Sequence, residues 1–171
     1  MEKIDIDAII GRIQITPEFK PIFDKVILSG RRMIGSADTA PAIQKQLDKP
    51  GDFATNLAEG VVAIVFQLWT SSGKTLPPQI MGPVTFQLTL EAFDFLQKSN
   101  DDRTSKQVLG DAVDGALGML LKGFNVDPAQ IEQFVKQNKA ALTAADAGPG
   151  SAQPPTQPPP AGGMIAQGGV Q

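Results

Sequence analysis

Apolar side chains recur every three or four residues along most of the chain, the spacing that gathers them on one face of an α-helix. One such run extends from Phe19 to Ile34 and stops at Gly35. A second extends from Phe53 to Trp69 and contains the stretch VVAIVF, which has the composition of a strand. Because the helical spacing continues well beyond the length of a typical strand, we predict a buried helix there.

The same spacing predicts helices on both sides of these two. They cover residues 6–13, 41–48, 77–95, 108–121 and a last segment that begins at 128. Pro83 falls inside the 77–95 segment and is expected either to kink that helix or to mark its true start. The pattern therefore predicts an all-α fold, a bundle of about five or six helices.

Capping and turn residues separate the predicted helices. The expected N-caps are Thr16 (with Pro17 at the first helical position), Asp52, the pair Asp101 and Asp102, and Asp127. Asp127 opens the sequence DPAQ, which has the pattern of a capping box with proline at its first helical position. These residues predict where the helices begin.

The composition changes abruptly after Asp146, the last charged residue. Residues 147–171 contain six glycines, six prolines and no charge, so they are not expected to form a regular helix. Their 154–160 portion favours extended polyproline II, and apolar side chains return at the far end as Met164, Ile165 and Val170. We predict a helical domain over 1–146 and a Pro/Gly/Gln-rich C-terminal extension over 147–171. The extension is either a flexible tail or an extended arm anchored by those three side chains.

The residue types that are missing narrow the possible chemistry. The 171 residues contain no cysteine, histidine or tyrosine, which excludes disulfides, thiolate nucleophiles, histidine bases and the usual zinc sites. The formal charge of −3 argues against nucleic-acid binding, and Lys20, Lys25, Arg31 and Arg32 are read as the solvent face of their helix. The first residues lack the apolar core of a signal peptide, so we expect a soluble intracellular product.

The triplet Gly73-Lys74-Thr75 matches the end of a phosphate-binding loop. That loop also requires a glycine where Leu68 stands and a helix directly after the threonine, where Pro77 intervenes instead. We therefore predict an ordinary loop between two helices.

Two pairs of carboxylates share a predicted helix face, Glu91 with Asp94 and Asp111 with Asp114. Metal sites built in this way normally add a histidine, which the chain lacks, and Asp111 and Asp114 lie opposite the apolar stripe of their helix, where a solvated face explains the pair better. We expect no enzyme activity, no cofactor and no metal.

Four apolar residues are candidates for contacts with another subunit. Phe86, Leu90 and Phe93 lie on a second apolar face of the 77–95 helix, and Trp69 ends an apolar stripe beside a polar loop. The alternative is that they serve only the core of one chain. The segments 61–69 and 77–95 also resemble a helical hairpin able to insert in a membrane after a conformational change.

The order of helices and turns resembles small helical virion proteins of tailed bacteriophages. The resemblance rests on KVILSGRRMI, GDFATNLAEGVVAIVFQLW, the Pro-Pro turn in LPPQIMGPVTFQLTLEAFDFL, and GFNVDPAQIEQFV, covering about residues 20–140. The uncharged ending AGGMIAQGGV is similar to the ends of several such proteins. The resemblance supplies no catalytic or binding residue.

This resemblance implies a non-enzymatic structural subunit of the virion, made in the bacterial host cytoplasm, with itself and other virion proteins as partners. Its arm would thread between neighbours. The first alternative is an internal protein ejected with the DNA, which lines a channel in the host envelope; only this reading involves a membrane. The second, from a different class, is a cytosolic adaptor domain that binds a partner peptide in a helical groove. None of the three requires specific nucleic-acid binding.

Overall fold

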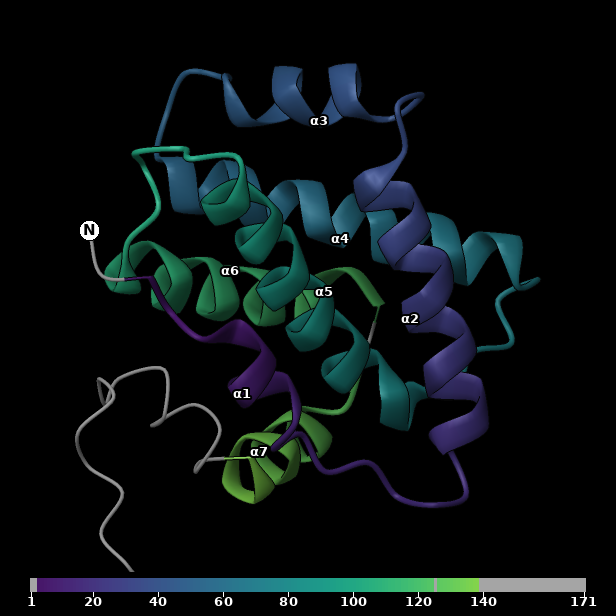
Figure 1. The fold of residues 1–171 in the computed structure, drawn as a ribbon. Helices are drawn as coiled ribbons and strands as arrows, with labels where there is room; N and C mark the ends of the chain where they lie inside the picture. The colour runs from purple at the N-terminus through teal and green to yellow at the C-terminus, as the bar shows by residue number, and fades with distance from the viewer. Residues whose placement is uncertain (1–2, 125, 139–171) are drawn as a thin grey trace, which may run out of the picture.

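The computed structural model describes residues 3–124 and 126–138, which form seven α-helices and no strand (Figure 1). This confirms the predicted all-α class. The helices are α1 (Ile6–Ile10), α2 (Lys20–Gly35), α3 (Ala40–Leu47), α4 (Phe53–Ser71), α5 (Pro78–Lys98), α6 (Lys106–Phe124) and α7 (Pro128–Gln137). The predicted C-terminal arm lies outside the described residues.

Helix α5 forms the centre of the bundle, with α2, α4 and α6 packed around it (Figure 1). The short helices α1 and α7 also contact α5, while α3 lies over α4. Fifteen of the 21 residues of α5 are buried, including polar Thr85 and Thr89, whose hydroxyl groups donate to the backbone carbonyls of Met81 and Thr85. A helix covered on this many sides must be apolar nearly all round, as its sequence is.

Two predicted N-caps are confirmed by their hydrogen bonds. The Asp52 carboxylate accepts from the backbone N–H of Thr55 at 2.8 Å, and the Asp127 carboxylate accepts from that of Ala129 at 2.9 Å. The predicted capping box is not formed, because the Asp127 carboxylate bonds the N–H of Ala129 and not that of Gln130, and the buried side-chain oxygen of Gln130 has no partner among the described residues. Pro78 is the first residue of α5, as the Pro-Pro turn predicts.

Two other predicted N-caps are wrong. The helix expected to start at Thr16 starts at Lys20, because residues 16–19 form a turn in which the N–H of Phe19 donates to the carbonyl of Thr16. Asp101 binds Arg103 instead of capping α6, and the Ser105 hydroxyl accepts the N–H of Val108 there. An arginine two residues away gives Asp101 a charged partner, which a helix N-terminus does not.

Pro83 neither breaks nor starts α5, which runs through it from Pro78. A proline clashes with the carbonyl four residues earlier, and here that residue is Gln79, in the exposed first turn of the helix. The ring therefore disturbs only the start of α5, where the backbone has room to adjust.

Helices α4 and α5 end in the same way, each at a residue with positive φ. Gly73 (φ 69°) ends α4, with the N–H of Lys74 donating to the carbonyl of Trp69 at 2.9 Å. Asn100 (φ 57°) ends α5, with the N–H of Asp101 donating to the carbonyl of Leu96 at 3.1 Å. Both are Schellman-type ends, which use glycine or asparagine at the left-handed position.

The N-terminal segment is attached to the bundle at both of its ends by side-chain amides. The buried Gln97 of α5 pairs with the backbone of Ile4, and the buried Asn138, at the end of α7, accepts the N–H of Gln14 at 2.9 Å. Between these points Ile6 and Ile9 are buried in the core. Residues 4–14 thus fasten α1 between α5 and the C-terminal end of α7.

Candidate functional site

A cluster of partly exposed aromatic side chains lies where α4 and α6 end. Phe66 and Trp69 of α4 and Phe124 of α6 form a triad with ring centroids 5.5–5.9 Å apart, two of the three pairs being edge-on. Phe66 is 53% exposed, while Trp69 and Phe124 are half-buried. We call these three residues the aromatic triad. Exposed aromatic side chains of this size are typical anchors of protein interfaces.

The GKT triplet lies beside this triad in the turn between α4 and α5. The Lys74 ammonium is 5.2 Å from the centre of the Trp69 ring, a cation–π contact. The Thr75 hydroxyl donates to the carbonyl of Ser72, which closes the turn. Lys74 therefore flanks an aromatic surface, in the interhelical loop that the sequence predicts.

The prediction for three of the four candidate contact residues is wrong. Phe86, Leu90 and Phe93 are each at most 1% exposed, inside the core of this one chain. Phe86, for example, packs edge-on against Phe134 of α7, with ring centroids 5.6 Å apart. The second apolar face of α5 is covered by neighbouring helices and presents no surface to another subunit.

The other candidates have different outcomes. Trp69 lies at the surface within the aromatic triad, and its role in contacts with another subunit stays a prediction. Met164, Ile165 and Val170 lie outside the described residues.

An ion pair that the sequence analysis does not predict links α2 to α5. The Arg31 guanidinium forms an ion pair with Glu91 at 2.7 Å, and the Gln87 amide donates to the same Glu91 oxygen, also at 2.7 Å. The Glu91 side chain is only 10% exposed, and its other oxygen is buried without a partner among the described residues. The hydrogen bond to Glu91 raises the pKa of Arg31. Arg31 and Glu91 are 60 positions apart, so helical spacing could not bring them together in a prediction.

Two adjoining clefts flank this ion pair, and both include Ile10 and Arg31 in their walls. The smaller, of about 350 Å³, is lined by Asp7, Glu91, Asp94 and Lys98 among others. The larger, of about 770 Å³, lies between residues 10–15 and the outer face of α2. Ligand sites typically have volumes of about 300–1,000 Å³, so both clefts are large enough to hold one.

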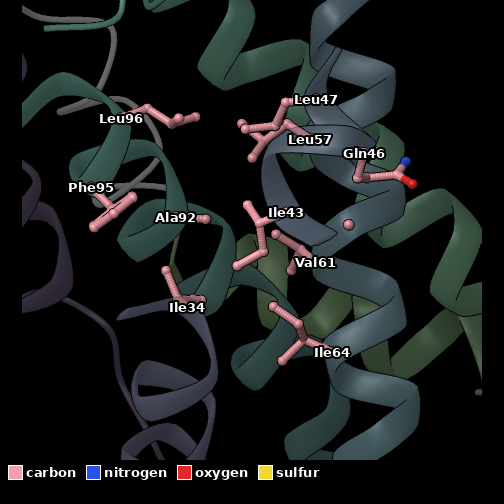
Figure 2. A pocket seen from close by; sticks show the side chains of 11 residues that line it. Ile34, Ile43, Gln46, Leu47, Leu57, Val61, Ile64, Ala92, Phe95 and Leu96 are labelled. Carbon is pink, nitrogen blue, oxygen red and sulfur yellow. The ribbon is translucent and has the colours of Figure 1, made fainter. Parts of the chain in front are cut away.

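The apolar gap beneath α3 is much smaller (Figure 2). Ile43 and Leu47 of α3 face Ile34, Val61 and Ala92 across it, and the gap measures about 30 Å³. Its walls offer almost no polar atoms to hold a water molecule. We interpret it as incomplete packing between α3 and the bundle.

Arg103 connects three separate elements. Its guanidinium pairs with Asp101 at 2.7 Å and with Asp48 at 3.2 Å, and it lies 4.3 Å from the centre of the Phe53 ring. The hydrogen bond from Arg103 lowers the pKa of Asp101. The pKa of Asp48 is lowered first by the Gln44 amide and then by Arg103. These contacts hold the loop before α6 against the end of α3 and the start of α4.

Among residues 3–124 and 126–138, no three carboxylates come close enough together to hold a metal ion. One described helix, α4, is long and apolar enough to cross a membrane by length and composition alone, and one third of it is buried in the bundle. Core helices pass the same test of length and composition.

Comparisons with protein-family models, with characterised proteins and with solved structures give no match to this chain. The function therefore has to be argued from its own surface.

Proposed function

We propose that this chain is a non-enzymatic structural subunit that assembles with copies of itself, and that its setting is the virion of a tailed bacteriophage. The observation that carries self-assembly is the aromatic triad, in which Phe66 exposes half of its surface at the end of α4. An exposed aromatic cluster gains free energy when another protein surface covers it. The virion setting rests on the resemblance in helix order and turns.

The surroundings of the triad favour a second copy of the chain as its partner. From Gly60 to Leu90 the sequence carries a single charge, Lys74, and that ammonium already lies over Trp69. A two-fold contact places each triad against its own copy, and such an isologous contact suits a patch with few charges because it brings little like charge into opposition. The uncharged extension 147–171 adds a second means of joining subunits, since an extended segment with a few apolar anchors can bridge neighbours.

The tryptophan within the triad reports directly on this contact, because it is the only one in the chain. If copies meet at the triad, the emission of Trp69 shifts to shorter wavelength as the protein concentration rises. The variant Phe66→Ser should abolish this dependence. The matched control is Phe95→Ser, which removes an apolar side chain that is 43% exposed on α5, away from the triad. Emission that is independent of concentration in the native protein would contradict assembly through the triad.

The ejected-protein alternative is supported by one observation, the apolar character and limited burial of α4. In that case α4 and α5 leave the bundle as a hairpin and enter a bilayer. Flotation with liposomes tests this at neutral pH and after mild destabilisation with urea. Co-flotation after destabilisation would favour it, and failure to float in both conditions would exclude it as the main activity.

A further inference from the structure

The larger cleft is formed by residues 10–15 on one side and α2 on the other, with Gln87 of α5 also in its wall. Its walls are polar and apolar in equal parts, and they include Leu28, an apolar side chain that is 50% exposed. Half-exposed leucine in a cleft of about 770 Å³ provides a place for an apolar side chain from another segment.

Each charged side chain that lines this cleft already has a partner of opposite charge, either in the lining or next to it. Lys20 pairs with Asp24 at 2.9 Å, and Arg31 pairs with Glu91 at 2.7 Å. No unpaired charge in the cleft therefore selects an ionic ligand. An uncharged occupant enters without the cost of losing the hydration of its own charges.

The backbone on one side of the cleft has hydrogen-bonding capacity to spare. Among the described residues, the N–H of Ile15 has no acceptor, although the N–H of its neighbour Gln14 is bonded to Asn138. An unpaired main-chain group near an exposed apolar side chain such as Leu28 is a combination that recognises an extended peptide, since the backbone is bound through hydrogen bonds and alternate side chains through apolar contacts.

The described part of the chain ends beside this same cleft. Asn138, the last described residue, contacts Gln14, which lines the cleft, at 2.9 Å. Residues 139–171 follow, and their last eleven, AGGMIAQGGVQ, are uncharged and glycine-rich, with Met164, Ile165 and Val170 as their larger apolar side chains. A chain reaches up to about 3.3 Å per residue, so these residues can span the distance to a neighbouring subunit.

We propose that the cleft between residues 10–15 and α2 binds the C-terminal tip, residues 161–171, of a second copy of the chain. The proposal rests on the proposed function, because it identifies the receptor for the arm in self-assembly. A neighbour is favoured over the same chain because the sequence at 154–160 has five prolines and favours a stiff, extended spacer that carries the tip away from its origin.

Site-directed disulfide formation tests this in the full chain, which has no native cysteine. Leu28→Cys is placed in one preparation and Ile165→Cys in a second, tagged preparation, and the two are mixed under oxidising conditions. A disulfide forms only when the two Cα atoms come within about 7 Å. The control replaces Leu28→Cys with Phe95→Cys, at a position that is 43% exposed against 50% for Leu28 and does not line this cleft.

The proposal predicts a cross-linked heterodimer at least tenfold more abundant with Leu28→Cys than with Phe95→Cys. Equal yields would overturn it. A disulfide that forms only within one chain, in the double variant Leu28→Cys with Ile165→Cys at high dilution, would also overturn it, because the occupant would be the chain's own tip. The concentration dependence of Trp69 emission tests the proposed function separately, so a failed cross-link with intact self-assembly rejects only this cleft.

Discussion

Gln97 and Ile4 are paired through both backbone groups of the isoleucine. The N–H of Ile4 donates to Gln97 Oε1 at 2.9 Å, and Gln97 Nε2 donates to the carbonyl of Ile4 at 3.3 Å. A side-chain amide that holds a backbone in this way imitates one rung of a β-ladder. It fixes the start of the N-terminal segment on α5 and so positions Ile6 and Ile9 in the core.

Replacing Gln97 with alanine should therefore loosen the N-terminal segment more than it loosens the bundle. Two hydrogen bonds are lost, and the expected cost is about 1–3 kcal/mol in the free energy of unfolding. Amide hydrogen exchange should become faster at residues 4–10 while α6 keeps its protection. The control is Gln67→Ala, an exposed position on α4, which should leave both measurements unchanged. Equal acceleration throughout the protein would show that the segment does not open separately.

The helices were predictable from the sequence because their signals are local. Asp52 and Gly35 lie within one turn of the boundaries they set, and Pro78 starts its helix for the same reason. Thr16 and Asp101 failed as caps because other partners were available to the backbone at Phe19 and to the Asp101 carboxylate. Such competition between neighbouring groups cannot be read from spacing.

The surface residues were harder to predict, because burial depends on the tertiary arrangement. Phe86 and Phe93 gave α5 a second apolar face, and apolar faces are buried equally well by another subunit or by another helix of the same chain. Because α5 lies between α2, α4 and α6, its second apolar face is buried by helices of the same chain. The sequence indicates Trp69 as a surface candidate, whereas its partner Phe124 comes from a helix distant in the sequence and carries no signal that pairs the two.

The contact between α2 and α5 depends on a glycine. A Cβ atom at Gly30 would lie 2.5 Å from Leu88 Cδ2, so a larger residue must displace the buried Leu88 side chain and disturb the contact between the two helices. Gly30→Val should lower the free energy of unfolding by about 1–3 kcal/mol. Gly110→Ala in α6 should act in the opposite direction and stabilise by about 0.5–1 kcal/mol, because nothing lies within 4 Å of the new Cβ atom. Urea denaturation measures both, and a loss of stability in Gly110→Ala would contradict this account of the packing.

The buried Glu91 depends on Arg31 for its charge compensation. Arg31→Met leaves the carboxylate with Gln87 as its only donor among the described residues and should cost about 1–3 kcal/mol. Glu91→Gln in the same chain should recover part of that loss, because the uncompensated charge is then absent. Lys20→Met is the control, since its pair with Asp24 is exposed and is expected to contribute about 0–0.5 kcal/mol. A double-mutant cycle that gives no coupling between Arg31 and Glu91 would contradict the role of this pair.

The contacts of Arg103 predict a dependence of stability on acidic pH. Because Arg103 lowers the pKa of Asp101 in the folded protein, the unfolded state binds more protons as the pH falls below the ordinary aspartate value of about 3.9. The stabilisation is complete above that value and is lost as the pH falls through the folded pKa. Thermal unfolding between pH 6 and pH 2 should show this loss in the native protein and a smaller loss in Arg103→Gln. Parallel curves for the two proteins would contradict it.

Self-assembly is the central claim, and the native mass of the purified protein tests it most directly. Light scattering is measured over a range of concentrations for the full chain and for a chain that lacks residues 147–171, a deletion that removes none of the described contacts. We expect a defined oligomer for the full chain and a shift towards the monomer without the extension. A monomer at every concentration in both forms would contradict the proposal that this protein assembles with copies of itself.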